Sequence, residues 1–228
     1  MGLSENVARV RERIDAACRR SGRDAAGVRL VAVSKTFSSE RIREAFAAGI
    51  TEFGENRIQE ASEKLPLLED LPIVWHLVGH LQSNKATRAR ELFAWVHSVD
   101  SVRLAEKLHH AAANANDRLP ALLQVNLGGE ESKFGFSEDA VLPAAETAGR
   151  LASLDVRGLM LIPPYFDNPE QTRPYFRSLR QLAERVAAAR PPGVSMQELS
   201  MGMSHDFEAA IEEGATMIRV GTAIFGPR

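Results

Sequence analysis

Lys35 has the clearest chemical potential in this sequence, because it directly follows an apolar, β-branched run at residues 28–34 (VRLVAVS). Such a run is typical of a strand that is buried on both faces of a parallel sheet. An amine at the end of a buried strand loses hydration, which lowers its pKa toward neutrality. A neutral amine can condense with a carbonyl group to form a Schiff base. The alternative is a structural lysine in an ion pair, and a lone lysine at a strand end favours that alternative.

Two places near the C-terminus have the residues of an anion-binding turn. Gly202 and Ser204 precede a helical pattern, and the N-terminus of a helix offers unbonded N–H groups and the positive end of its dipole. Gly221 and Thr222 come at the end of the last apolar run. Each feature alone is common in caps and turns. Together they indicate a phosphate site, because α/β barrels often bind phosphate after their seventh and eighth strands.

Arg219 lies two residues before Gly221, so the alternation of side chains along a strand directs both toward the same opening. A buried arginine needs a partner. One interpretation is a salt bridge to an acid at a strand end, such as Glu55 or Asp100, and the sequence leaves it open. The other is a hydrogen bond to the ring nitrogen of a bound cofactor.

His76 and His80 have the four-residue spacing of a helical metal-binding pair. However, residues 73–79 (IVWHLVG) have the pattern of a strand, and no glutamate follows His76, so we do not expect a metal site. We expect His80 to be a polar residue that lines the same opening as Lys35. Helix capping or core packing is an equal alternative for it.

Eight short apolar runs predict the strands that position these residues. They comprise residues 28–34, 51–53, 73–79, 95–99, 121–127, 156–162, 197–201 and 217–221. Between them lie seven helical patterns, at residues 39–48, 56–68, 84–92, 102–115, 138–152, 169–189 and 205–213. The patterns place Lys64 and Lys107 on polar helix faces. A further amphipathic helix is predicted over residues 4–20.

The predicted fold is α/β, a single (β/α)8 TIM-type barrel with an additional N-terminal helix, in one domain over residues 1–228. An open doubly wound sheet has the same alternation and is the alternative. That fold usually has a G-x-G-x-x-G sequence after its first strand, and none follows residue 34. In a barrel, reactive groups gather at the C-terminal ends of the strands, where Lys35 and the glycine turns fall.

The composition excludes several classes of partner. A formal net charge of −2 gives no overall basic field for nucleic acid. No apolar run approaches the ~18 residues that span a bilayer. Cys18 is the only cysteine, which excludes an intramolecular disulfide and fits a reducing compartment. The first residues lack the apolar core of a secretory signal, so we expect a cytoplasmic protein without nucleic-acid or membrane partners.

Four blocks of the sequence resemble a known family, nearly from end to end. They are VAVSKTFSSERIREAFAAGITEFGENRIQEA, WHLVGHLQSNK, VNLGGEESKFGF and LSMGMSHDFEAAIEEGATMIRVGTAIFG. Their order and spacing are similar to those of the pyridoxal phosphate homeostasis proteins (YggS/PROSC family). The resemblance implies an alanine-racemase N-terminal-domain type of barrel that carries pyridoxal 5'-phosphate (PLP) as an internal aldimine. It also implies a role in intracellular vitamin B6 homeostasis, with no robust catalysis.

The resemblance assigns roles to five residues by motif. Lys35 of VSK would form the aldimine. Ser204 of SMGMS, with Gly221 and Thr222 of RVGT, would hold the phosphate group. Arg219 would face the pyridine nitrogen. No catalytic residue is implied.

Three further residues resemble those that surround the cofactor, without individual roles. They are Asn56 of FGEN, His80 of GHLQ and Met201. Arg57 and Ile58 stand where the family more often has tyrosine and valine, which puts in doubt only the local lining of the site.

A PLP-dependent racemase-like enzyme is the alternative function. An arginine at the ring nitrogen keeps the pyridine unprotonated, which weakens its capacity to stabilise a substrate carbanion. Racemases of this barrel type also have a second, β-rich domain, and this sequence ends two residues after Gly226. We therefore expect a monomer that passes PLP to apo-enzymes. A third interpretation, an aldolase acting on a sugar phosphate, uses the same lysine without a cofactor.

Overall fold

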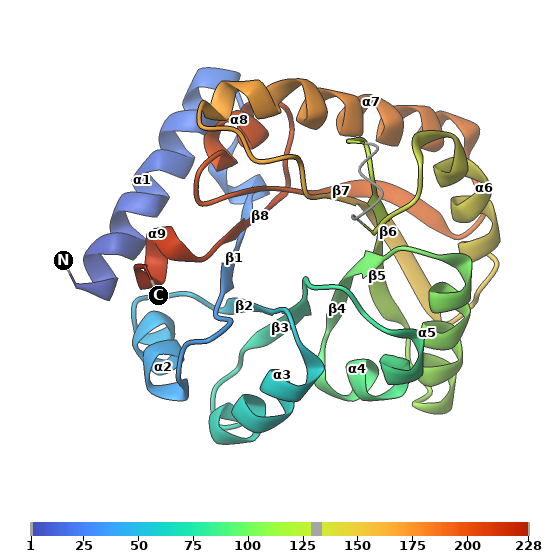
Figure 1. The fold of residues 1–228 in the computed structure, drawn as a ribbon, viewed down its shortest axis with the longest axis horizontal. Coiled ribbons are helices and arrows are strands. Elements are labelled where there is room, and N and C mark those ends of the chain that lie inside the picture. Colours follow the sequence, from blue (N-terminus) through green and yellow to red (C-terminus); the bar gives the residue numbers. More distant parts are fainter. Residues whose placement is uncertain (1, 129–133, 228) are drawn as a thin grey trace.

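The computed structural model describes residues 2–128 and 134–227. Eight parallel strands follow one another around a closed barrel, and the last strand pairs with the first (Figure 1). The strands are β1 (Arg29–Val33), β2 (Glu52–Glu55), β3 (Val74–Leu77), β4 (Trp95–Val99), β5 (Leu119–Val125), β6 (Leu154–Leu161), β7 (Val194–Met203) and β8 (Met217–Val220). The predicted barrel is confirmed, and the open doubly wound sheet is wrong.

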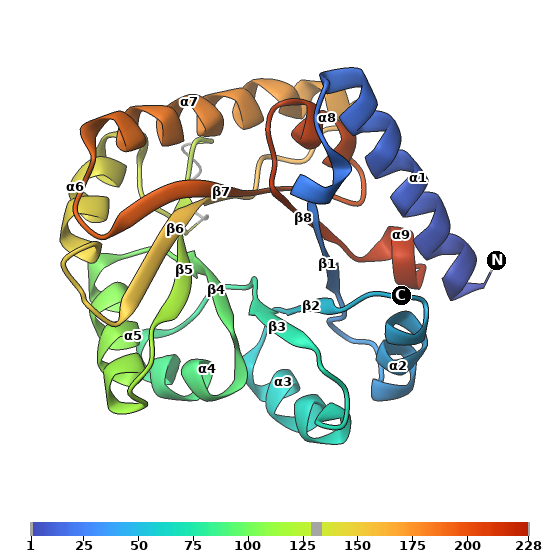
Figure 2. The same cartoon turned by 180° about the vertical axis from the view of Figure 1, so that it is seen from behind.

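Helices surround the barrel on the outside, as Figures 1 and 2 show from opposite sides. They are α1 (Leu3–Ser21), α2 (Ser39–Ala47), α3 (Ile58–Lys64), α4 (Ala86–Leu92), α5 (Val102–Asn114), α6 (Glu138–Ala148), α7 (Arg173–Ala189), α8 (Phe207–Glu212) and α9 (Thr222–Phe225). No helix in the described residues has the length and apolar character that crossing a bilayer requires.

The additional N-terminal helix α1 is confirmed and lies against α8 and α9. Its apolar face is buried, and two ion pairs hold its polar edge to α8: Arg13 with Glu208 at 2.7 Å and Arg20 with Glu212 at 2.6 Å. The helix ends at Gly22, which adopts the left-handed conformation (φ 68°) that glycine allows without strain. The pattern of residues 4–20 thus predicted this helix to within one residue at each end.

Several element boundaries differ from the sequence prediction by up to four residues. Strand β7 is longer than the predicted residues 197–201, because Ser195 before that run and Gly202 after it interrupt the apolar pattern. The short helix α9 was not predicted, because four residues are too few to show a helical period.

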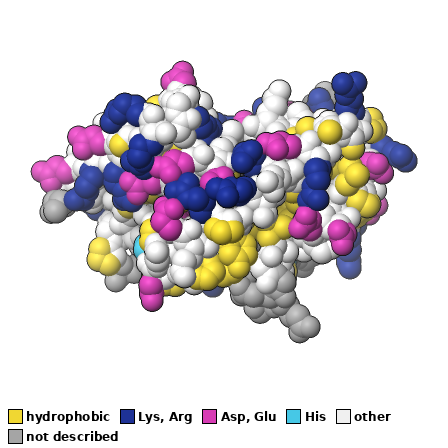
Figure 3. Space-filling model, turned by 90° about the horizontal axis from the view of Figure 1, so that it is seen from above, with side chains coloured by type: hydrophobic (Ala, Val, Ile, Leu, Met, Phe, Trp, Pro, Cys, Tyr) yellow, Lys and Arg dark blue, Asp and Glu magenta, His cyan; other side chains and the backbone are white. Residues whose placement is uncertain are grey.

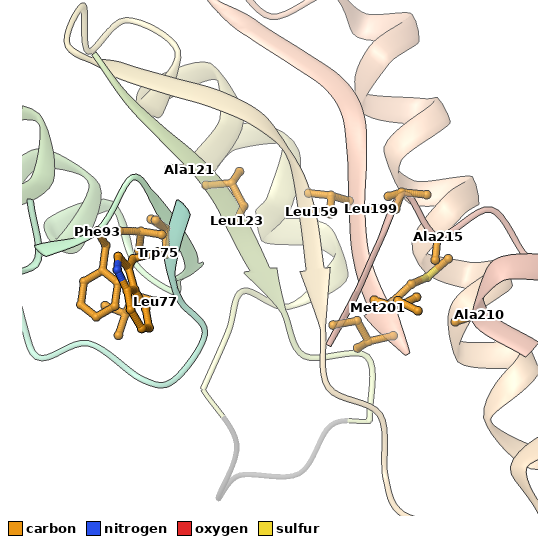
Figure 4. Packing of buried hydrophobic residues seen from close by; sticks show 14 of the residues in the cluster. Trp75, Leu77, Phe93, Ala121, Leu123, Leu159, Leu199, Met201, Ala210 and Ala215 are labelled. Carbon is orange, nitrogen blue, oxygen red and sulfur yellow. The ribbon is translucent and has the colours of Figure 1, made fainter. Parts of the chain in front are cut away.

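The apolar core lies mainly between the strands and the helices. Figure 4 shows Leu123, Leu159 and Leu199 on the neighbouring strands β5, β6 and β7. On the face of the molecule in Figure 3, basic and acidic side chains are interspersed, and no large area carries one sign of charge. This distribution matches the small net charge of the sequence.

Replacing Phe176 of α7 with alanine should strongly destabilise the fold. The Phe176 side chain is fully buried, so the substitution Phe176→Ala leaves a cavity and should lower the free energy of unfolding by about 3–5 kcal/mol. The measurement is urea denaturation followed by circular dichroism. In the control variant Leu67→Ala the side chain is 59% exposed, and the free energy should change little. Equal losses in both variants would contradict the packing described here.

Candidate functional site

Lys35 lies on the turn that follows β1, and its side chain is half-buried. The next residue, Thr36, has a left-handed backbone (φ 70°), which is strained for a residue other than glycine. Two contacts stabilise the turn: the Thr36 N–H donates a hydrogen bond to the Glu60 carboxylate on α3, and the Phe37 ring stacks on Phe225 of α9 with centroids 4.8 Å apart. Contacts with α3 and α9 therefore hold the turn that carries Lys35.

A second lysine, Lys64 at the end of α3, supports this turn from below. Its Nζ donates to the Ser34 carbonyl oxygen at 2.9 Å, to Glu55 Oε1 at 3.1 Å and to Glu60 Oε1 at 2.5 Å. The Ser34 hydroxyl donates to Glu55 Oε1 at 2.7 Å. Burial raises the pKa of Glu55. Burial also acts to raise the pKa of Glu60, but the hydrogen bonds from Lys64 and the Thr36 N–H outweigh it, so the pKa of Glu60 is lowered.

The sequence prediction for Lys64 missed this role. We placed Lys64 on a polar helix face, but its side chain is 12% exposed and points at the end of β1. The signal was the four-residue spacing of Glu60 and Lys64 on one helix, together with Glu55 at the preceding strand end.

The two predicted anion-binding turns come together beside β1. The Ser204 hydroxyl accepts hydrogen bonds from the N–H groups of Gly221 (3.1 Å) and Ala223 (3.3 Å), at the start of α9, where Thr222 is the first residue. Gly221 packs closely on β1, since a Cβ added to it would lie 3.3 Å from the Val33 carbonyl oxygen. Val33 is two residues from Lys35, so these donors and the amine lie on neighbouring strand ends.

Gly202 allows β7 to turn toward this place. It has φ 90°, and an added Cβ would lie 2.5 Å from the Ala210 Cβ, so a larger residue does not fit. After the turn, the Met203 N–H donates to Asp206 Oδ1 at 2.7 Å, and burial raises the pKa of Asp206. These contacts set the position of Ser204.

Arg219 is buried on β8, next to β1. Its Nη1 donates to Ser200 Oγ at 2.6 Å and its Nη2 to the Leu161 carbonyl oxygen at 2.8 Å. Burial lowers the pKa of Arg219 to about 10, so it remains a cation at neutral pH. Across residues 2–128 and 134–227, Arg219 forms no salt bridge, so the alternative partners Glu55 and Asp100 are wrong.

His80 lies at the mouth of the barrel, on the other side. Its Nδ1 is 2.9 Å from Asp100 Oδ2, and its ring stacks on Phe134 with centroids 3.5 Å apart. It helps to line a cavity of about 160 Å³, whose other walls are Val78, Gln124, Val125, Asn126, Phe134 and Ile162. Lys35 is not among the residues that line this cavity, so the expectation that His80 shares an opening with Lys35 stays a prediction.

Asn56 and Met201 are placed less directly. Asn56 follows β2 and is half-buried, and Gly79 approaches its backbone so closely that an added Cβ would lie 2.3 Å from the Asn56 carbonyl oxygen. Met201 is fully buried and lies beside Ala210 and Ala215 (Figure 4). The role of Met201 at the mouth stays a prediction.

The mouth of the barrel thus combines an amine, a set of anion donors and a buried cation on β1, β7 and β8. This set can hold a small molecule by an anionic group at one end and a carbonyl group at the other. In the part of the chain that the structure describes, no cluster of three or more histidine, cysteine, aspartate or glutamate side chains could hold a metal ion.

Comparisons with known proteins agree with this geometry. The family model described as "Alanine racemase, N-terminal domain" matches residues 6–228. A pyridoxal phosphate homeostasis protein from Aquifex aeolicus is 44% identical over 100% of this chain and 99% of that protein. One from Pseudomonas aeruginosa is also 44% identical, over 99% of this chain and 96% of that protein. The chain belongs to the pyridoxal phosphate homeostasis protein family.

Solved structures of this family and of more distant proteins have the same fold. PipY of Synechococcus elongatus, solved with PLP bound, is 40% identical and has a TM-score of 0.87, over 99% of this chain and 100% of PipY. Alanine racemase of Clostridium difficile is 15% identical with a TM-score of 0.76, over 99% of this chain and 56% of the racemase. The likeness to the racemase shows the shared barrel alone.

The substitution Glu60→Gln should loosen the turn that carries Lys35. The amide has no charge, so the hydrogen bond from the Thr36 N–H weakens and this N–H should exchange faster with deuterium. Because the pKa of Glu60 is lowered, protection in the unaltered protein should persist as the pH falls through the usual range of a glutamate and be lost only below it. Glu63→Gln, an exposed change on the same helix, is the control. Unchanged exchange at Thr36 in Glu60→Gln would exclude this role.

Proposed function

We propose that this protein binds PLP in the cytoplasm, holds it covalently on Lys35 and serves PLP homeostasis. The observation that carries the proposal is the meeting of Lys35, the Ser204–Gly221 donors and Arg219 on adjacent strand ends. The name of the relatives and the PLP-bound PipY structure support it. The single, buried cysteine supports a reducing compartment.

The residues present fit PLP at each of its functional groups. The N–H groups of Gly221 and Ala223 converge on the Ser204 hydroxyl, and such a set of donors suits a phosphate group. PLP supplies an aldehyde that can condense with a primary amine. Lys35 supplies that amine from the neighbouring strand. Asn56, His80 and Met201 would complete the lining, and Thr222 would add to the phosphate donors.

The network below the turn gives Lys64 a structural role. Its Nζ donates hydrogen bonds to the Ser34 carbonyl oxygen, to Glu55 and to Glu60. Lys64 therefore orients the backbone at Ser34, and Lys35, at the end of β1, is the amine that we propose as the nucleophile.

Arg219 favours retention of PLP over racemase-like chemistry, which remains the second candidate. As a cation with a pKa of about 10, it would donate a hydrogen bond to the pyridine nitrogen of bound PLP without protonating it. An unprotonated pyridine is a weak electron sink for a carbanion. The sugar-phosphate aldolase has no observation in its favour beyond the shared lysine and phosphate donors.

We further propose that the protein is a monomer that passes PLP to apo-enzymes. Three large apolar side chains on the loops at the mouth support a contact with other proteins there: Phe134 (52% exposed), Ile162 (37%) and Tyr165 (76%). Isolated apolar residues on a surface are ordinary, but a group around a ligand site suits a docking partner.

The substitution Lys35→Ala should abolish the yellow absorbance of the PLP-loaded protein. Without the amine no covalent link can form, while the half-buried position tolerates alanine, so the circular dichroism spectrum should be retained. Lys107→Ala, an exposed change on α5, is the matched control and should keep the colour. A yellow Lys35→Ala protein would refute the assignment of Lys35.

The substitution Ser204→Ala should weaken PLP binding through the phosphate group alone. A hydrogen bond to a charged group contributes about 1.5–3 kcal/mol, so the Kd for PLP should rise roughly 10-fold to 100-fold. Pyridoxal has the same ring and aldehyde but no phosphate, so its Kd should not change. Equal losses for PLP and pyridoxal would show that Ser204 does not contact the phosphate.

A further inference from the structure

A chain of buried polar side chains runs through the inside of the barrel from Arg219. Ser200 Oγ, which accepts from Arg219 Nη1, lies 2.9 Å from His97 Nδ1. His97 Nε2 lies 2.9 Å from His76 Nδ1, and the two rings meet edge to face at 85°. His76 Nε2 lies 3.0 Å from Glu52 Oε2, outside the direction of a ring N–H, so this last step is an electrostatic contact. The function proposed above uses none of these residues except Arg219.

The chain connects the two ends of the barrel. Arg219 lies toward the C-terminal end of β8, whereas Glu52 is the first residue of β2 at the opposite rim. There Arg29, the first residue of β1, binds Glu52 through Nε at 3.0 Å and Nη2 at 2.8 Å. Arg29 and Glu52 line a cavity of about 370 Å³ outside this rim. Ser200, His97 and His76, between the two ends, have no exposed surface.

The Glu52 carboxylate sets the direction of the hydrogen bonds in this chain. It favours a proton on His76 Nε2, which faces it without a directed hydrogen bond. In a neutral ring, His76 Nδ1 then accepts from His97 Nε2, and His97 Nδ1 accepts from the Ser200 hydroxyl. Ser200 in turn accepts from Arg219, which can only donate. One tautomer of each histidine thus satisfies every hydrogen bond from Arg219 to His76.

The surroundings keep both histidines neutral. Burial, followed by the nearby charges of His76, Arg219 and Arg29, places the pKa of His97 well below its usual value. Burial also lowers the pKa of His76, although Glu52 and Glu198 oppose this effect and Arg29 adds to it. The two neutral rings add no negative charge beside Arg219, and the acid whose charge acts on it is Asp206.

We propose that Ser200, His97 and His76 are positioning residues that hold Arg219 as a fixed, charged hydrogen-bond donor toward the ring nitrogen of the cofactor. Glu52 and Arg29 anchor the far end of the chain. With its hydrogen given to His97, Ser200 presents its lone pairs to Arg219, and the Leu161 carbonyl oxygen holds the second Nη. The chain offers no acidic proton to the ring nitrogen. This inference rests on the proposed PLP binding.

The first test examines the histidines in the unaltered protein without any cofactor. Histidine labelled with ¹⁵N should give, for both His97 and His76 near neutral pH, one unprotonated Nδ1 signal and one protonated Nε2 signal in the NMR spectrum. The variant His97→Gln assigns the signals, and His110→Gln, an exposed change on α5, is the control. A charged ring, or a proton on Nδ1 of either histidine, would overturn the proposal whether or not PLP binds.

The second test follows the cofactor itself, using PLP labelled with ¹⁵N at the pyridine nitrogen. In Ser200→Ala and His97→Gln the pyridine signal should shift, because Arg219 is no longer held, while borohydride should still fix PLP on the Lys35 peptide. Ser200→Thr keeps the hydroxyl and should restore the signal of the unaltered protein. An unchanged pyridine signal in PLP-loaded Ser200→Ala would overturn the positioning role. If the unaltered protein takes up no PLP, the proposed function fails, and the histidine test decides separately whether the chain exists.

Discussion

The pairing of β8 with β1 is the contact on which the site depends. It closes the barrel, and its register places Val31 beside Arg219 and Ala32 beside Val220. Lys35 and the Gly221 turn therefore leave the barrel side by side, although they are 186 positions apart in the sequence. A shift of one residue would direct Arg219 to the helix side of the wall, because side chains alternate between the two faces of a strand. Barrel closure and site formation are thus one event.

Burial then gives the charged groups of the site different tasks. Lys64 pairs with two carboxylates and donates a hydrogen bond that braces the backbone at Ser34. Arg219 has neutral partners, a hydroxyl and a carbonyl oxygen, so its charge remains available to a ligand. In a medium of low polarity such a charge acts more strongly than at the surface. The same barrel interior therefore holds one cation as a structural group and presents another at the mouth.

The sequence predicted the elements whose signal is local. The apolar runs marked the eight strands, and their order placed Lys35 and the two glycine turns at one end of the barrel. The sequence could not predict contacts between strands that are distant around the barrel. His97 on β4 meets Ser200 on β7 inside the barrel, and this contact depends on register and strand tilt, which leave no trace in either segment. Lys64 was missed for a related reason, because its helix packs so that a polar face covers a strand end.

The account stands on one claim: the amine of Lys35 and the donors at Ser204 and Gly221 serve a single ligand. The most direct measurement is peptide mapping by mass spectrometry after PLP loading and borohydride reduction, with and without excess inorganic phosphate. The account predicts that the added mass lies on the peptide with Lys35 and that phosphate suppresses its formation. Added mass spread over several lysines, or an adduct at Lys35 that phosphate does not affect, would contradict it.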